Sequence, residues 1–308
     1  KKVSQIEVME ELPNHRTVYQ LYTIKLKDYS IRSELQNYLL EKGIFTKVYF
    51  YPIHLKSYYK SKFGYKSSYV VTFNSGTSAL HSILLAYGIT SGEVIVPSFS
   101  FISTANSAIL AGAKPIFAEI ENDTLGLDPE DVKNHITHKT KAIIPVHYGG
   151  KICRNLEVLK EIAEDYDLIL IEDNAESFGA KINDTFAGTF GDAGMLSFCQ
   201  NKVITTGEGG AICTNDKNIY ERLLLIRSHG RVEQPGTNYF SSINDMDYIE
   251  VGYNYRMPTM NAALGISQLQ KIDRIIDLRR RIGKFYDENL KKVSQIEVME
   301  ELPNHRTV

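Results

Sequence analysis

The sequence lacks the features that mark several broad classes of protein. It has no block of basic residues that could bind a nucleic acid or an anionic membrane surface, and its formal net charge is only -2. No apolar run approaches the ~20 residues of a membrane-spanning helix, and residues 1–12, KKVSQIEVMEEL, lack the apolar centre of a signal peptide. We therefore expect a cytoplasmic protein with neither nucleic acid nor membrane as a partner.

Cysteine is scarce as well. Cys153, Cys199 and Cys213 are unevenly spaced and form neither a CxxC pair nor a disulfide framework. We expect each to be a small buried residue rather than a ligand, and we expect no metal site. Hydrophobic residues at 43% and charged residues at 23% are ordinary for a soluble globular protein. The expected partners are small molecules or another copy of the chain.

The two ends of the chain carry the same sequence. Residues 1–18, KKVSQIEVMEELPNHRTV, recur letter for letter as residues 291–308. Solenoid repeats are degenerate, numerous and short in period, so this is no solenoid. We interpret the chain as circularly permuted or wrapped, with Tyr19 continuing a chain that runs through Leu290. Because both copies cannot occupy one place in one molecule, we expect one copy to be surplus or to lie in a neighbouring subunit.

From residue 69 onward, short apolar segments alternate with segments of helical periodicity. The expected strands cover 69–73, 94–96, 115–118, 142–146, 168–171, 195–198 and 211–213. Helices are expected over 74–88, with a stop at Gly88, and over 103–111 and 156–166. This alternation predicts an α/β domain over residues 67–232, with a mainly parallel sheet covered on both faces.

The remaining parts of the chain indicate a second, smaller lobe. Residues 1–66 contain an expected strand at 19–26, a helix at 31–43 and a strand at 44–51, which form a small α+β lobe. Residues 233–308 begin with a polar loop, and Pro258 then opens one long helix that leads back to the small lobe.

Residues 74–78, NSGTS, form a strand-to-helix turn rich in hydroxyl groups and glycine. The free backbone N–H groups of a helix start, aided by the helix dipole, bind a phosphate dianion, and Gly76 allows close approach. The alternative is that Ser75 or Thr77 only caps the helix. The turn alone does not decide between a phosphate site and a cap.

Two further segments carry groups suited to a pyridine cofactor. The buried strand ILIED ends in Asp173, which could pair with a protonated pyridine nitrogen, although acids at strand ends are common. Lys202 follows another apolar strand, where its amine could form a Schiff base and move a proton. The glycines at 207–210 could form a hairpin turn or let the backbone pack beside a cofactor. Phe101, after the strand ending at Pro97, could stack on a ring or pack in the core.

Five motifs, in the same order and at similar spacing, resemble those of the DegT/StrS-type sugar aminotransferases. They are SGTSAL, PSFSFISTANSAILAGAKPIF, IEDNAESFGA, SFCQNKVITTGEGG and GYNYRMPTMNAALGISQLQKID. The resemblance covers residues 67–290, and residues 19–59 are similar to the C-terminal lobe of that family. It implies a three-layer pyridoxal 5'-phosphate (PLP) dependent transferase of fold type I, with a mainly parallel sheet and a small α+β lobe.

The resemblance also implies roles for individual residues. Lys202 matches the lysine that binds the cofactor covalently, and Asp173 matches the partner of the pyridine nitrogen. The other matching positions are Gly76, Thr77, Ser78 and Ser197 at the phosphate, Phe101 stacked on the ring, Glu176 near the ring hydroxyl, Asn254 at the phosphate of the neighbouring subunit, and His54 near the sugar. The family therefore implies a homodimer with shared active sites.

The activity implied is transfer of an amino group from glutamate to a nucleotide-linked keto sugar, often a 4-keto-6-deoxyhexose on UDP, GDP or dTDP, in polysaccharide biosynthesis. A dehydrating branch of the family has His where this chain has Lys202, which argues against dehydration. Two alternatives stay open. One is a catalytically idle or truncated PLP-fold protein with a binding or regulatory role, because the segment that relatives carry before the SGT turn is not found here. The other is an α/β protein that binds a phosphosugar without PLP.

Overall fold

The computed structural model describes residues 69–232, 247–296 and 298–308, with short pieces at 6–8, 24–26, 37–38 and 41. The chain divides into two compact units, residues 1–49 and 50–308. In the first, strand β1 (Ile6–Val8) pairs antiparallel with β2 (Ile24–Leu26). Strand β2 lies within the strand expected at 19–26, and residues 37, 38 and 41 are helical as expected. The strand expected at 44–51 lies outside the described residues.

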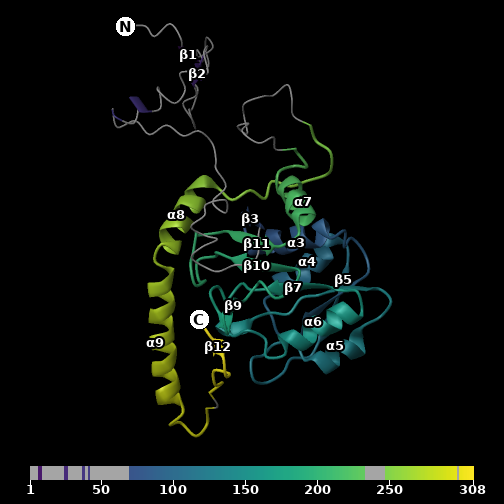
Figure 1. Cartoon of the computed structure of the whole chain (residues 1–308), viewed down its shortest axis with the longest axis vertical. Helices are drawn as coiled ribbons and strands as arrows, with labels where there is room; N and C mark the ends of the chain where they lie inside the picture. The colour runs from purple at the N-terminus through teal and green to yellow at the C-terminus, as the bar shows by residue number, and fades with distance from the viewer. Residues whose placement is uncertain are drawn as a thin grey trace. The chain divides into compact units, whose positions relative to one another are not determined.

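The second unit is built on a seven-stranded sheet (Figure 1). Its strands, in spatial order, are β3 (Tyr69–Phe73), β11 (Gly210–Thr214), β10 (Ala193–Ser197), β7 (Ile169–Asp173), β6 (Thr140–Ile143), β4 (Glu93–Pro97) and β5 (Lys114–Ala118). Only β11 runs against the other six. The expectation of a mainly parallel α/β sheet is confirmed. Strand β6 ends earlier than expected because Pro145 has no backbone N–H to continue the ladder.

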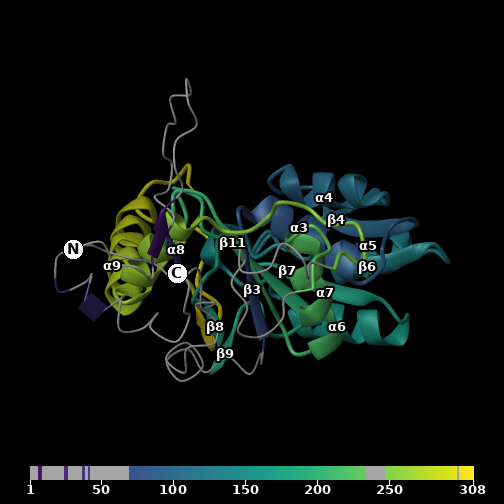
Figure 2. The ribbon, with the colours of Figure 1, turned by 90° about the horizontal axis from the view of Figure 1, so that it is seen from above.

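Helices cover both faces of this sheet, which makes three layers. One face is covered by α3 (Gly76–Ala86), α4 (Ser103–Ala111) and α7 (Lys217–Arg227), and the other by α5 (Pro129–His135) and α6 (Leu156–Asp165). Figure 2 shows α4 and α6 on opposite sides of the sheet. The strands are apolar throughout because successive residues face opposite layers: Val94 and Val96 lie in the α3 cluster, whereas Ile95 lies in the α6 cluster.

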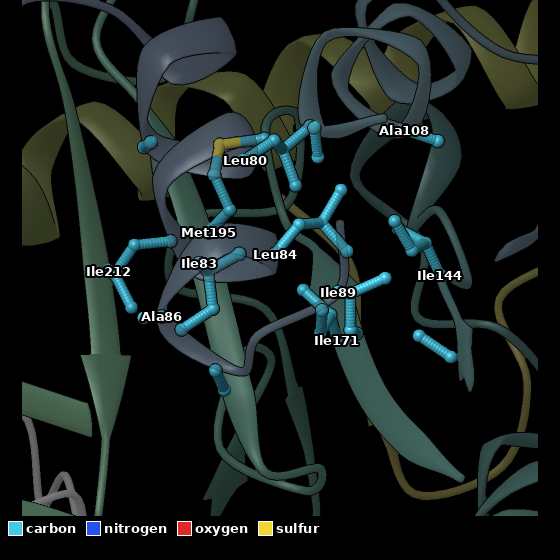
Figure 3. Close-up of a cluster of buried hydrophobic side chains, with 14 of the residues drawn as sticks. Leu80, Ile83, Leu84, Ala86, Ile89, Ala108, Ile144, Ile171, Met195 and Ile212 are labelled. Carbon is cyan, nitrogen blue, oxygen red and sulfur yellow. The ribbon is translucent and has the colours of Figure 1, made fainter. Parts of the chain in front are cut away.

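The larger core cluster lies between α3 and the sheet (Figure 3). Leu80 and Leu84 of α3 are fully buried there, together with Ile171, Met195 and Ile212 of the strands. The cluster fixes the start of α3 against the ends of β7 and β10. This packing sets the positions of the polar side chains that follow β7 and β10 relative to the start of α3.

The single long helix expected after Pro258 is wrong, because the structure has two helices. Helix α8 (Thr259–Leu269) and helix α9 (Ile272–Leu290) are separated by a turn at Gln270 and Lys271. Both helices contribute to one apolar cluster of the unit, through Leu269 at the end of α8 and Ile272 and Ile276 of α9. Gly265 in α8 faces Thr206, and Ile276 in α9 packs against Gly179. The turn lies between the buried side chains of Leu269 and Ile272. None of the helices in the described residues is long and apolar enough to cross a membrane.

The second copy of the repeated sequence packs on this unit. Its strand β12 (His305–Arg306) pairs antiparallel with β8 (Lys181–Ile182), which pairs with β9 (Thr185–Phe186). Lys151 Nζ also donates to the carbonyl oxygen of Glu300 at 2.7 Å. Of the first copy, the structure describes Ile6–Val8, which form strand β1. Permutation of the chain stays a prediction.

We predict that Leu80→Ala lowers the free energy of unfolding by about 3 kcal/mol, because it removes buried methyl groups and leaves a cavity under α3. Urea denaturation of the purified protein measures the change. The matched control is Leu278→Ala on α9, where the side chain is 46% exposed and the cost should stay below about 1 kcal/mol. Equal losses in the two variants would contradict the role given to this cluster.

Candidate active site

Five strands that run in the same direction bring their following residues to one edge of the sheet. These strands are β3, β4, β6, β7 and β10. The segments that follow them carry Asn74–Ser78, Ser98–Phe101, His147, Glu176 and Lys202. In α/β sheets, ligands bind beyond the carboxyl ends of the strands. The candidate residues therefore gather where this fold is suited to binding.

The turn before α3 caps the helix and leaves two backbone donors free. Ser75 Oγ accepts from the N–H of Ser78 at 3.0 Å, and the Ser78 side chain accepts from the N–H of Ser75 at 3.2 Å, which completes a capping box. The amide N–H groups of Gly76 and Thr77 have no acceptor among the described residues, as expected at a helix start. The cap at Ser75 is confirmed, and Gly76 and Thr77 offer free donors, but the phosphate site stays a prediction.

Two glycines keep this turn close to the neighbouring strands. A Cβ at Gly76 would come within 3.1 Å of the Cβ of Ser197, so the turn and the end of β10 are in contact. A Cβ at Gly210 would lie only 2.5 Å from the carbonyl oxygen of Ser75. Gly210 therefore lets the backbone of the turn pack against β11. This is close packing of the backbone within the chain, and packing of the glycines at 207–210 beside a cofactor stays a prediction.

Asp173 carries a buried carboxylate that lies on the α3 and α4 side of the sheet. It is 3% exposed, and it accepts from Thr104 Oγ1 at 2.8 Å and from the N–H of Ala175 at 3.2 Å. Burial raises the pKa of this carboxyl, and the hydrogen bonds from Thr104 and Ala175 and the charge of Lys202 act in the opposite direction. A carboxylate has about four lone-pair positions, so it retains acceptor capacity for a cationic donor.

The amine of Lys202 lies near this carboxylate and is held by a second acid. Lys202 Nζ is 3.3 Å from Glu176 Oε1, and its side chain is 16% exposed. The other oxygen of Glu176 accepts from the N–H of Gly149 at 2.9 Å, in the 3-10 turn η3 (Tyr148–Gly150). Arg279 of α9 donates to the carbonyl oxygen of Lys202 at 3.1 Å. Glu176 thus holds the amine of Lys202, the η3 turn holds Glu176, and α9 holds the backbone of Lys202.

A buried pair behind Asp173 was not predicted from the sequence. His147 Nε2 lies 2.9 Å from Glu172 Oε2, and both side chains are fully buried. Because the N–H of Cys153 donates to His147 Nδ1, the ring proton sits on Nε2 and is donated to Glu172. The backbone N–H of His147 donates to the carbonyl oxygen of Asp173 at 3.1 Å. The pair joins the ends of β6 and β7.

Two of the predicted residues, Phe101 and Asn254, are exposed. Phe101 is 75% exposed, whereas the ring of the nearby Phe99 packs against Tyr148 at 4.8 Å. Asn254 is exposed, and its backbone carbonyl accepts from the side chain of Asn74 at 3.3 Å within the same chain. His54 lies outside the described residues. The roles expected of these residues stay predictions.

Comparison with known families gives a consistent match. The model of the DegT/DnrJ/EryC1/StrS aminotransferase family matches residues 1–69 and 65–308. GDP-perosamine synthase of Escherichia coli O157:H7 is 41% identical over 229 residues, which cover 74% of this chain and 60% of that protein. The chain thus spans about three fifths of the length of the curated relatives that it matches.

Solved structures with a similar fold include an aminotransferase and a sugar dehydratase. A DegT DnrJ EryC1 StrS aminotransferase from Brucella abortus is 29% identical, with a TM-score of 0.73, and the match covers 90% of this chain and 74% of that one. A mutant GDP-4-keto-6-deoxymannose-3-dehydratase with bound GDP-perosamine is 31% identical, with a TM-score of 0.72, and the match covers 88% and 73%. The expectation of a fold type I transferase is confirmed.

We predict that Asp173→Asn stabilises the protein when it is free of coenzyme, by on the order of 1 kcal/mol at pH 7, because it removes a charge that burial disfavours. The Asn amide can donate to Thr104 Oγ1, whose proton then turns to Ser100. Since the folded pKa of Asp173 is raised, the cost of its ionisation is absent below the unfolded pKa and complete above the folded one.

The gain should therefore shrink as the pH falls from 7 toward the unfolded pKa of ~3.9, which urea denaturation at pH 7 and at successively lower pH values measures. The control is Asp184→Asn in an exposed turn, which should change stability little over the same pH range. A variant at position 173 that is less stable than the native protein at pH 7 would contradict the account of the buried charge.

Proposed function

Because the chain belongs to the DegT/DnrJ/EryC1/StrS aminotransferase family, we propose that it transfers the amino group of glutamate to a nucleotide-linked 4-keto-6-deoxyhexose, with PLP as cofactor. The observation that carries this proposal is that Lys202, whose amine lies 3.3 Å from Glu176, is close enough for its charge to act on the buried carboxylate of Asp173. These are the two groups that a PLP transferase requires on either side of the pyridine ring.

The residues present fit PLP. The free amides of Gly76 and Thr77, with Ser197 in contact with Gly76, would hold the phosphate, while Ser78 completes the cap of the same helix. The unfilled acceptor positions of Asp173 suit a protonated ring nitrogen.

The other side of the ring is assigned from the family pattern. Glu176, which is in contact with Lys202, would accept a hydrogen bond from the ring hydroxyl of PLP. Phe101 would cover the ring face, and Asn254 would complete the phosphate site. His54 would contact the sugar.

When bound, PLP supplies an electron sink for the bonds that amino transfer breaks. Asp173 keeps the sink effective by accepting a hydrogen bond from the protonated ring nitrogen. Lys202 Nζ moves the proton, taking it from the Cα of glutamate and delivering one to the keto carbon of the sugar in the return half-reaction. Glu176 keeps the amine in place, and its hydrogen bond from Gly149 keeps Glu176 in place.

We propose a GDP-linked sugar as the acceptor. The support is that GDP-perosamine synthase is 41% identical and that a similar solved structure holds GDP-perosamine. Residues 233–246, in the polar loop before Pro258, lie outside the described residues. A comparison of GDP-, UDP- and dTDP-linked 4-keto-6-deoxyhexoses as acceptors, with glutamate as donor, tests the nucleotide.

Borohydride reduction of the protein incubated with PLP should attach the cofactor to Lys202, because the side chain of this lysine is largely buried, 3.3 Å from Glu176, and its charge acts on Asp173. Peptide mass mapping identifies the labelled residue. Lys202→Ala should lose the label and all transfer activity, whereas Lys217→Ala, on an exposed part of α7, should keep both. Label on another lysine, or none, would rule out the assignment.

Glutamate should then convert the bound cofactor to its amine form, which an absorbance change reports. Labelling at Lys202 without this conversion would instead favour a binding or regulatory role for the chain.

A homodimer with shared active sites is the assembly we propose. Support comes from the exposed side chain of Asn254 and from apolar side chains exposed on and before α4. These are Phe101, Ile102, Ile109 and Leu110, each at least 59% exposed. An apolar surface of this kind is typical of a protein interface.

Mixing two inactive variants tests the sharing of sites. In a mixed dimer of Lys202→Ala and Asn254→Ala, one site would carry both changes and the other neither, if Asn254 serves the partner. Activity should then recover to about a quarter of native, since half of the dimers are mixed and each has one intact site. If Asn254 serves the site of its own chain, beside Asn74, mixing recovers no activity.

A further inference from the structure

We propose that Thr104 is a positioning residue of this site, whose hydroxyl, held by Ser100, keeps the carboxylate of Asp173 ionised and aimed at the ring nitrogen of the cofactor. The inference rests on the proposed function and adds a residue that the family resemblance did not assign. It concerns this chain's own residues and can be tested by binding alone.

The geometry places Thr104 directly against the carboxylate. Thr104 is the second residue of α4, is 1% exposed, and its Oγ1 lies 2.8 Å from Asp173 Oδ2. Asp173 has the same side-chain parity in β7 as Ile171, which packs in the α3 and α4 cluster, so its carboxylate faces the start of α4. The contact thus follows from the pleat of β7 and the position of α4.

The direction of each hydrogen bond is fixed by the chemistry. A carboxylate only accepts, so the single hydroxyl proton of Thr104 is donated to Asp173. Thr104 Oγ1 is then an acceptor toward Ser100 Oγ, 2.8 Å away, and Ser100 must donate. The resulting relay, from Ser100 to Thr104 to Asp173, delivers donors to the negative charge and favours the ionised form.

Other groups around Asp173 do not replace this donor. The N–H of Ala175 donates to the other carboxylate oxygen, and the backbone N–H of His147 donates to the main-chain carbonyl of Asp173. The side chain of His147 is committed to Glu172, and the amine of Lys202 to Glu176. Among the described residues, Thr104 is therefore the one whose side chain donates a hydrogen bond to this carboxylate.

Thr104→Val tests the proposal, because valine has nearly the same shape and lacks the hydroxyl. We expect the dissociation constant for PLP, measured by absorbance titration at pH 7.5, to rise about tenfold, since the variant loses a hydrogen bond to a charged group. Loss of the donor also raises the pKa of Asp173 further. As the pH is lowered, the PLP affinity of the variant should therefore begin to decrease at a higher pH than that of the native protein.

A PLP analogue with carbon in place of the ring nitrogen separates a positioning role from a structural one. Thr104→Val should bind this analogue as the native protein does, since no ring N–H is present for Asp173 to accept. Thr104→Ser, which retains the hydroxyl, should restore native PLP affinity, and Ser100→Ala should show a smaller loss than Thr104→Val. The matched control is Ser107→Ala, a fully buried hydroxyl of α4 that does not reach Asp173 and should leave PLP affinity unchanged.

Two outcomes would overturn the proposal: PLP affinity of Thr104→Val within twofold of native, or an equal loss for PLP and the analogue. Circular dichroism and thermal unfolding of each variant confirm that the comparison concerns folded protein. If the native chain itself does not bind PLP, the proposed function fails and this inference fails with it, whereas native binding with an unaffected variant overturns this inference alone.

Discussion

The burial of one carboxylate is the constraint on which the rest of the site depends. Asp173 sits at the end of a central strand, under the helices that cover one face of the sheet, where burial opposes its charge. The surrounding fold offsets this cost only in part, with one hydroxyl and one backbone N–H. A cationic ring nitrogen would satisfy the remaining acceptor positions, so binding and stability of this region are coupled.

Much of the fold could be predicted from the sequence because strands and helices are marked by local patterns, such as apolar runs and helical periodicity. Each expected strand from residue 69 onward corresponds to a strand of the seven-stranded sheet, and the helix at 103–111 has the predicted bounds. The convergence of Asp173, Lys202 and the turn at Gly76 also followed, since parallel strands end at one edge. The contact of Thr104 with Asp173, 69 residues apart, depends on the packing of α4 and has no local signal.

Where the sequence prediction failed, contacts between distant segments decided the structure. The apolar spacing continues through Gln270 and Lys271, yet α8 and α9 separate there at a turn whose flanking residues, Leu269 and Ile272, are both buried against distant segments. The repeated sequence makes the same point. Ile6–Val8 form a strand paired with β2, whereas the identical Ile296 and Val298 belong to no strand. The same short sequence adopts two conformations because different segments of the chain contact its two copies.

The two adjacent acids that end strand β7 show how the pleat divides structural from chemical roles. Both read as acids at a strand end, but successive side chains point to opposite faces. Glu172 accepts from His147 Nε2 and from the backbone N–H groups of Gly188, Phe190 and Gly191, which fills its acceptor positions. Asp173 accepts two hydrogen bonds on its side chain, which leaves some of its acceptor positions unfilled. The carboxylate of Glu172 therefore holds the strand ends together, whereas that of Asp173 retains acceptors for the ring nitrogen in the proposed function.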